Sequence, residues 1–153
     1  VFELSPYLWG PCPINDDITR AVGAERIERI WPFREIIDAG AMIMAGSGGP
    51  VVADVNPLPA IETLLTRESP GGSEEKFGLS QAIRLREAID LFTLWPALIL
   101  HQGAELGRLA PDYLADFVVL DRNPFEIPVR ELHKVRCLRT FISAREVHTL
   151  PIE

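Results

Sequence analysis

The sequence predicts an α/β fold followed by a small part made of strands. Short apolar runs alternate with helix-like segments before Ser80, and after Leu114 the pattern is typical of strands alone. In addition, 47% of the 153 residues are hydrophobic, which is the composition of a core-forming globular piece. A chain of this length can bury one core of its own.

The first half of the sequence predicts an ordered series of strands and helices. In order, we expect a strand over 2–8, a short helix with N-cap chemistry at 15–17, helical turns over 24–30, a helix over 32–40, a buried strand over 42–45 and a helix over 57–67. Pro32 and Pro57 suit the start of a helix, where a backbone N–H is not needed.

The second half predicts a loop, a long helix and then strands. We expect a solvated loop over 68–80, a helix over 85–100 kinked at Pro96, a strand over 116–120, and a hairpin of strands 136–143 and 145–149 with Ser143-Ala144 at its tip. The loop is the best candidate boundary. We therefore divide the chain into residues 1–80, connecting helices over 81–113 and a β-part over 114–153.

The loop after the predicted strand at 42–45 has the features of an active-site loop. It runs Gly46-Ser47-Gly48-Gly49-Pro50, and α/β barrels carry catalytic side chains on the loops that follow their strands. Yet no residue from Met42 to Val52 can ionise near neutral pH. The loop therefore predicts a site whose acidic group is missing.

The same loop allows a second interpretation, a serine hydrolase with Ser47 as its nucleophile. Ala45-x-Ser47-x-Gly49 has the spacing of a nucleophile elbow, but an elbow needs a helix directly after the serine. The run Pro50-Val51-Val52 disfavours such a helix. A tight strand-to-loop turn is the simpler interpretation.

The three histidines, His101, His133 and His148, do not form a metal-binding motif. None pairs with another at His-x-His or His-x-x-x-His spacing. We expect His101 to cap the end of a helix, His133 to lie on a solvated face and His148 to point outward. Asp116 and Asp121, which flank a predicted strand, are expected to cap turns.

Composition excludes two classes of partner. The chain has 15 basic and 22 acidic side chains, a net charge of −7, and no basic patch with interleaved aromatic residues, so we expect no nucleic-acid binding. The longest apolar stretch, Leu91 to Leu100, is too short to span a membrane.

Cys12 and Cys137 are expected to be ordinary reduced thiols, and we expect a cytoplasmic protein.

Short matches along almost the whole chain resemble one known family. They are Pro6–Pro11, Glu25-Arg26, Trp31–Arg34, Asp38–Ala41, Ala45–Ser47, Pro50-Val51, Asn56–Leu58, Thr66-Arg67 and Leu114–Phe125. Together they resemble the C-terminal part of a family 3 amidohydrolase, close to the N-substituted formamide deformylase branch. The resemblance implies the last strands and helices of a TIM-type barrel, plus part of a small composite β-domain made from both chain ends. It also implies a hydrolase of non-peptide carbon–nitrogen bonds, of amide or formamide type, that uses a divalent metal such as zinc.

This chain departs from the family pattern at Gly48. The family has Gly-Ser-Asp at 46–48, and its Asp touches the metal and handles the proton of the attacking water. Glycine can do neither, and the family's histidine ligands would all lie upstream of Val1. We therefore expect no metal and no cofactor in this chain, no catalytic residue, and no hydrolysis by the chain alone. Trp9 and Ser47 are possible pocket-lining residues.

The resemblance leaves the partners of the chain open. A small amide substrate is expected only if the barrel is complete. The alternative is a non-catalytic interaction or scaffold module, or a partial chain completed by a separate N-terminal barrel segment. Because an incomplete barrel exposes strand edges and apolar surface, we expect self-association with Met42, Met44, Leu98 or Leu100 in or near the contact.

A further departure from the family is the tip of the predicted hairpin. Ser143-Ala144 stands where the family has Asn-Gly, and a type I′ turn requires positive φ at both positions. Ser and Ala adopt positive φ poorly, so this swap is expected to cost about 1 kcal/mol.

Overall fold

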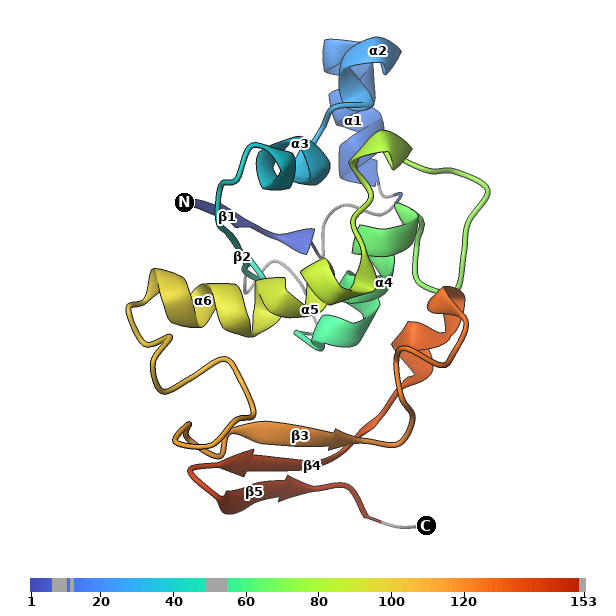
Figure 1. The fold of residues 1–153 in the computed structure, drawn as a ribbon. Helices are drawn as coiled ribbons and strands as arrows, with labels where there is room; N and C mark the ends of the chain where they lie inside the picture. Colours follow the sequence, from blue (N-terminus) through green and yellow to red (C-terminus); the bar gives the residue numbers. More distant parts are fainter. Residues whose placement is uncertain (7–10, 12, 49–54, 152–153) are drawn as a thin grey trace.

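The protein has a mixed α/β fold arranged in layers. The computed structural model describes residues 1–6, 11, 13–48 and 55–151. In Figure 1, helices α1 to α3 lie above the paired strands β1 and β2, helices α4 to α6 lie below this pair, and the sheet β3–β4–β5 lies below those helices.

Strands β1 (Phe2–Leu4) and β2 (Ile43–Ala45) pair in parallel, as the alternation of strands and helices predicts. The Phe2 N–H donates to the Met42 carbonyl at 3.1 Å, and the Gly46 N–H donates to the Leu4 carbonyl at 2.8 Å. These two bonds fix the register, in which Glu3 lies opposite Met44. Strand β1 is shorter than the strand predicted over 2–8, and residues 7–8 of that prediction lie outside the described residues.

Between these two strands, the described residues form the short helices α1 (Pro13–Val22), α2 (Ala24–Ile27) and α3 (Phe33–Asp38). The expected N-cap at 15–17 is wrong, because α1 begins at Pro13 and Asn15 is a buried residue inside the helix. A proline at the first position explains the earlier start, since its fixed φ suits the first turn.

The hydrophobic core lies between β2 and the helices α3, α4 and α5. Its fully buried residues include Phe33, Ile43, Leu64, Ala88, Leu91 and Leu132. Leu4 and Ala45 pack against the same cluster. Because side chains alternate across a strand, the residues between these positions face away from the core.

Helix α4 (Pro57–Thr66) has defined caps at both ends. The Asn56 side chain accepts from the Leu58 N–H at 3.1 Å, and Arg67 ends the helix in the left-handed conformation with φ +60°. The Arg67 guanidinium is buried, donating to the carbonyls of Phe77 at 2.8 Å and Ile30 at 3.2 Å, and this burial lowers its pKa to about 10. The segment over 68–80 is therefore attached to the end of α4 and is only partly solvated.

The predicted helix over 85–100 is broken, which corrects the expectation of a kink. Helix α5 (Leu85–Phe92) ends before Thr93, and α6 (Leu94–Ile99) begins after it. Pro96 has no N–H for the Phe92 carbonyl, and its ring would collide with that carbonyl in a continuous helix. Thr93, with φ −129° and ψ −78°, takes up the break.

The C-terminal part is an antiparallel sheet in the order β3–β4–β5. A short 3₁₀ helix lies between β3 and β4 in the chain. Its elements are β3 (Phe117–Leu120), the 3₁₀ helix η3 (Val129–Lys134), β4 (Cys137–Ile142) and β5 (Arg145–Thr149). Asp116 caps a turn as expected, because it accepts from the N–H of Ser143 at the hairpin tip at 2.7 Å. Asp121 instead accepts from the Arg136 N–H at 2.9 Å, which joins the end of β3 to the start of β4 and lowers the pKa of Asp121.

Helices of the described ranges do not reach the length and apolar character needed to cross a membrane. Cys137 is a free thiol, while Cys12 lies outside the described residues. The domain boundaries at 80 and 113, and the cytoplasmic location, stay predictions.

The hairpin tip offers a stability test. Ser143 and Ala144 have φ +49° and +62°, as the turn requires. Replacing Ser143-Ala144 by Asn-Gly should raise the free energy of unfolding by about 1 kcal/mol, because both new residues tolerate positive φ. Urea denaturation measures the change. Ala144→Val is the opposed control and should lower stability; a lower stability for Asn-Gly would contradict the turn geometry.

Candidate functional site

The loop after β2 lies at the carboxyl end of the parallel pair, as expected for an α/β site. Ile43 and Ala45 face the core, so Met44 and Gly46 lie on the other face of β2. Glu3 shares this face, because it lies opposite Met44 in the register. The candidate site therefore lies on the face of β1–β2 that points away from the core.

Two glycines of β2 and its loop leave room for side chains from β1. A Cβ added to Gly46 would collide with Oε1 of Glu3, so the Glu3 carboxylate occupies the space of the missing side chain. A Cβ added to Gly48 would lie 3.3 Å from Ser5 Oγ, and Gly48 has φ +63°. Sequence analysis missed Glu3; the signal was a single charged residue between two apolar residues in a predicted strand.

The structure describes only part of the predicted site. Ser47 is half-buried in the loop and takes part in interactions of its own. Trp9 lies outside the described residues, as do Pro50, Val51 and Val52, so the pocket role of Trp9 and the serine-hydrolase interpretation stay predictions.

The residues described at this site do not fit a divalent metal such as zinc. A zinc site needs three or four ligands, whereas this face offers the carboxylate of Glu3. Across the described ranges, no three His, Cys, Asp or Glu side chains come together as a metal-binding group. His101 and His148 are exposed, after α6 and on β5, and His133 lies on η3.

His133 does not lie on a solvated face, which corrects the sequence prediction. Its Nδ1 lies 2.8 Å from Oε2 of Glu62, and its backbone N–H donates to the same oxygen at 2.9 Å. The other oxygen of Glu62 accepts from the Gly71 N–H at 2.5 Å. Glu62 is fully buried in α4, so a buried carboxylate joins α4 to η3 and to the loop at 71. No spacing rule relates positions 62 and 133, which explains the error.

A second buried carboxylate, that of Glu68, joins the same elements. Arg130 donates to both of its oxygens at 2.8 Å, and Lys76 Nζ lies 2.7 Å from Oε1. The Glu68 side chain is only 1% exposed. Hydrogen bonds from Arg130 and Lys76 lower the pKa of Glu68 to about 2. Arg130 and His133, three residues apart on a 3₁₀ helix, stand on one face of η3 and both contact carboxylates near α4.

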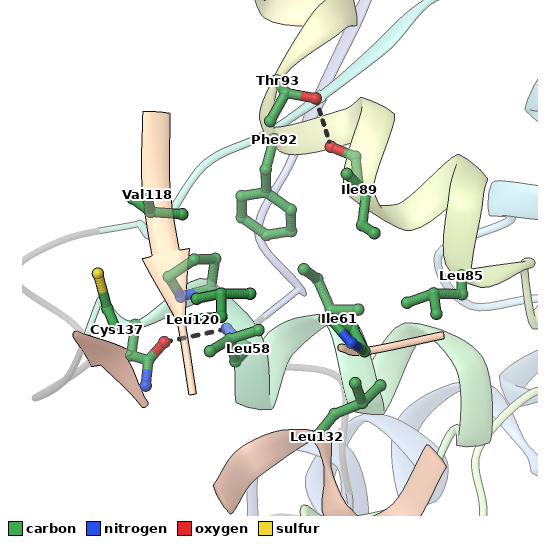
Figure 2. Close-up of a pocket in the computed structure, with 13 residues that line it drawn as sticks. Leu58, Ile61, Leu85, Ile89, Phe92, Thr93, Val118, Leu120, Leu132 and Cys137 are labelled. Atoms are coloured by element: carbon green, nitrogen blue, oxygen red, sulfur yellow. Dashed lines mark hydrogen bonds between the residues drawn. The ribbon is translucent and has the colours of Figure 1, made fainter. Parts of the chain in front are cut away.

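An apolar pocket of about 290 Å³ lies between α4, α5 and the sheet. Figure 2 shows Leu58 and Ile61 of α4, Ile89 and Phe92 of α5 and Val118 and Leu120 of β3 pointing into it. Its walls are almost entirely carbon, so it offers no chemistry of its own. We assign it to the packing of the sheet on the helices.

Comparison with known proteins identifies the family. A sequence profile described as the amidohydrolase family matches residues 9–148, which is most of the chain. The chain belongs to the amidohydrolase family. It is 29% identical over 128 residues to the putative amidohydrolase YtcJ of Bacillus subtilis, and 28% identical over 114 residues to N-substituted formamide deformylase of Arthrobacter pascens. It is also 28% identical over 134 residues to Protein LONG AFTER FAR-RED 3 of Arabidopsis thaliana.

These amidohydrolase relatives are much longer than this chain. The matches cover 83%, 74% and 87% of the chain but only 24%, 20% and 22% of the three relatives, in the order given above. An amidohydrolase structure from Thermotoga maritima superimposes with a TM-score of 0.58 and 19% identity, covering 77% of this chain and 26% of that one. This likeness supports the fold.

The Glu62 contacts predict a large loss of stability on mutation. Glu62→Ala should lower the free energy of unfolding by about 3 kcal/mol, because it empties a fully buried position and leaves the N–H groups of Gly71 and His133 without their acceptor. The matched control is Glu131→Ala on η3, whose side chain is 40% exposed and pairs at 3.6 Å; it should cost less than about 0.5 kcal/mol. Equal losses in urea denaturation would refute a special role for Glu62.

The Glu68 contacts predict a loss of stability in acid. Unfolded Glu68 takes up its proton near the ordinary pKa of 4.5, whereas folded Glu68 does so near 2. The stabilisation is therefore complete above pH 4.5 and is lost as the pH falls towards 2. The difference in unfolding free energy between the native protein and Glu68→Gln should shrink over this range. Glu74→Gln, at an exposed loop position, is the control, and a difference that does not depend on pH would contradict the cluster.

Proposed function

We propose that this chain is the C-terminal part of a hydrolase acting on non-peptide carbon–nitrogen bonds of amide or formamide type. The observation that carries the proposal is the loop 46–48 at the carboxyl end of a parallel strand pair, within a chain of the amidohydrolase family. The N-substituted formamide deformylase of Arthrobacter pascens supports the substrate class. In this proposal β1 and β2 are the last strands of a TIM-type barrel, and β3 to β5 belong to a composite β-domain.

We propose that the chain does not hydrolyse amides alone. Gly48 has no side chain to accept a proton from water, and the described residues supply too few ligands for a metal. What the chain would contribute is the face of β1–β2 that points away from the core, with Glu3 and Ser5 beside the space left by Gly46 and Gly48. The remaining groups would come from an N-terminal barrel segment.

The apolar surface supports an interaction role as the alternative. Met42, Leu98 and Leu100 are 39%, 40% and 61% exposed, and Met44 is half-buried. Helix α6 contacts β2, which brings these residues to one region of the molecule. This surface fits either an N-terminal barrel segment or a second copy of the chain. Sedimentation should show a dimer or larger species at micromolar concentration, and a compact monomer throughout would refute self-association.

Metal content and hydrolysis test the proposed function together. After dialysis the purified chain should hold less than stoichiometric zinc and should leave N-substituted formamides intact. A protein in which an N-terminal barrel segment completes this chain should bind zinc, and it should hydrolyse them only after Gly48→Asp restores the missing acid. Stoichiometric zinc in the chain alone would contradict the proposal that this chain by itself is inactive. Labelling of Ser47 by a fluorophosphonate would instead support a serine hydrolase.

A further inference from the structure

The apolar pocket in Figure 2 is a space that the sheet leaves unfilled where it packs on α4 and α5. Its volume is about 290 Å³, whereas interiors packed to native density hold few voids larger than a water molecule. Leu58, Ile61 and Leu132 form its deep wall and are 8%, 5% and 0% exposed. Val118 of β3 also lines it and is 53% exposed, so it lies at the mouth. The pocket therefore reaches from the surface to the buried side of α4.

The side chains around the pocket are held by other contacts, so they do not move in to fill it. Ile61 and Leu132 belong to the hydrophobic core, and Leu85, Ile89 and Phe92 pack against that core. An unfilled apolar space costs stability in proportion to its volume, because the atoms that line it lack partners on one side. A molecule that fits the space supplies these missing contacts.

The chemistry of the lining disfavours water and ions as occupants. Of the described residues that line the pocket, the polar ones are Asn56, Thr93 and Cys137. The Thr93 hydroxyl donates to the Ile89 carbonyl at 2.9 Å, the Asn56 side chain caps α4, and the Cys137 thiol donates to a carbonyl of its own strand at 3.4 Å. A water molecule needs two to four polar partners to stay in a cavity. The pocket therefore favours an uncharged apolar occupant.

We propose that this pocket binds a small uncharged molecule built of one or two hydrocarbon rings. An apolar cavity of about 150 Å³ lined by Leu, Ile and Phe side chains takes up benzene, and this pocket has about twice that volume. The ring of Phe92 and the branched side chains of Ile89 and Leu120 offer apolar contacts to such a ligand. Residues 43–48 do not line the pocket, so the site is separate from the loop of the proposed function and does not depend on it.

Toluene, titrated into the purified chain and followed by ¹H–¹³C NMR of the methyl groups, tests this inference. The methyl signals of Leu58, Ile61 and Val118 should shift and saturate with a Kd of about 1 mM, as expected for burying one small ring. Benzylammonium, which adds a charge to a ligand of similar shape, should not shift them, because the pocket offers a charge no partner.

Two substitutions on β3 form a matched pair. Val118→Phe puts a larger side chain into the mouth of the pocket and should weaken toluene binding by at least about ten-fold. Val119→Phe makes the same change one residue later, at a position that does not line the pocket, and side chains alternate across a strand. It should leave toluene binding unchanged. Both positions are exposed, at 53% and 37%, so both variants should keep the native fold.

Three results would overturn the inference. The first is no methyl shift in the native chain, and the second is equal binding of toluene by Val118→Phe. The third is a set of pocket methyl signals that change with protein concentration in the absence of toluene, since these would put a second copy of the chain in the pocket. The titration measures binding and no hydrolysis, so its failure leaves the proposed function untouched.

Discussion

The buried carboxylate of Glu62 is the interaction on which the arrangement of the two sheets depends. It lies in α4, where it accepts three hydrogen bonds from Gly71 and His133. A buried charge without such partners is costly, so this side of α4 has to pack against η3 and the loop at 71. Ile61 and Leu64, on another side of the same helix, pack in the core beneath β2. One helix thereby joins the parallel pair to the antiparallel sheet (Figure 1).

The other face of β1–β2 points away from this core. Ile43 and Ala45 anchor β2 to the core, while Glu3, Met44 and Gly46 face away from it. Core packing holds such a face in place from behind, which suits a ligand or a further segment of polypeptide in front of it. Family membership and the short span of the chain relative to its relatives are consistent with both uses.

Local patterns predicted most elements, and long-range contacts explain what they missed. Pro57 predicted the start of α4, and the alternation over 136–149 predicted the hairpin. Pro96 predicted a disturbance, but its position relative to the Phe92 carbonyl turned the expected kink into a break. The bond between Glu62 and His133 joins residues 71 positions apart, and the approach of Glu3 to Gly46 depends on strand register. Neither follows from spacing within one element.

The parallel pairing of β1 with β2 is the central claim, since it creates the candidate site. Hydrogen exchange of the Gly46 amide, together with nuclear Overhauser contacts between the Glu3 side chain and the Gly46 α-protons, tests it most directly. The structure predicts a protected Gly46 amide, because this N–H donates to the Leu4 carbonyl at 2.8 Å, and strong contacts to Glu3. An unprotected Gly46 amide without contacts to Glu3, in a chain whose α4 amides stay protected, would contradict it.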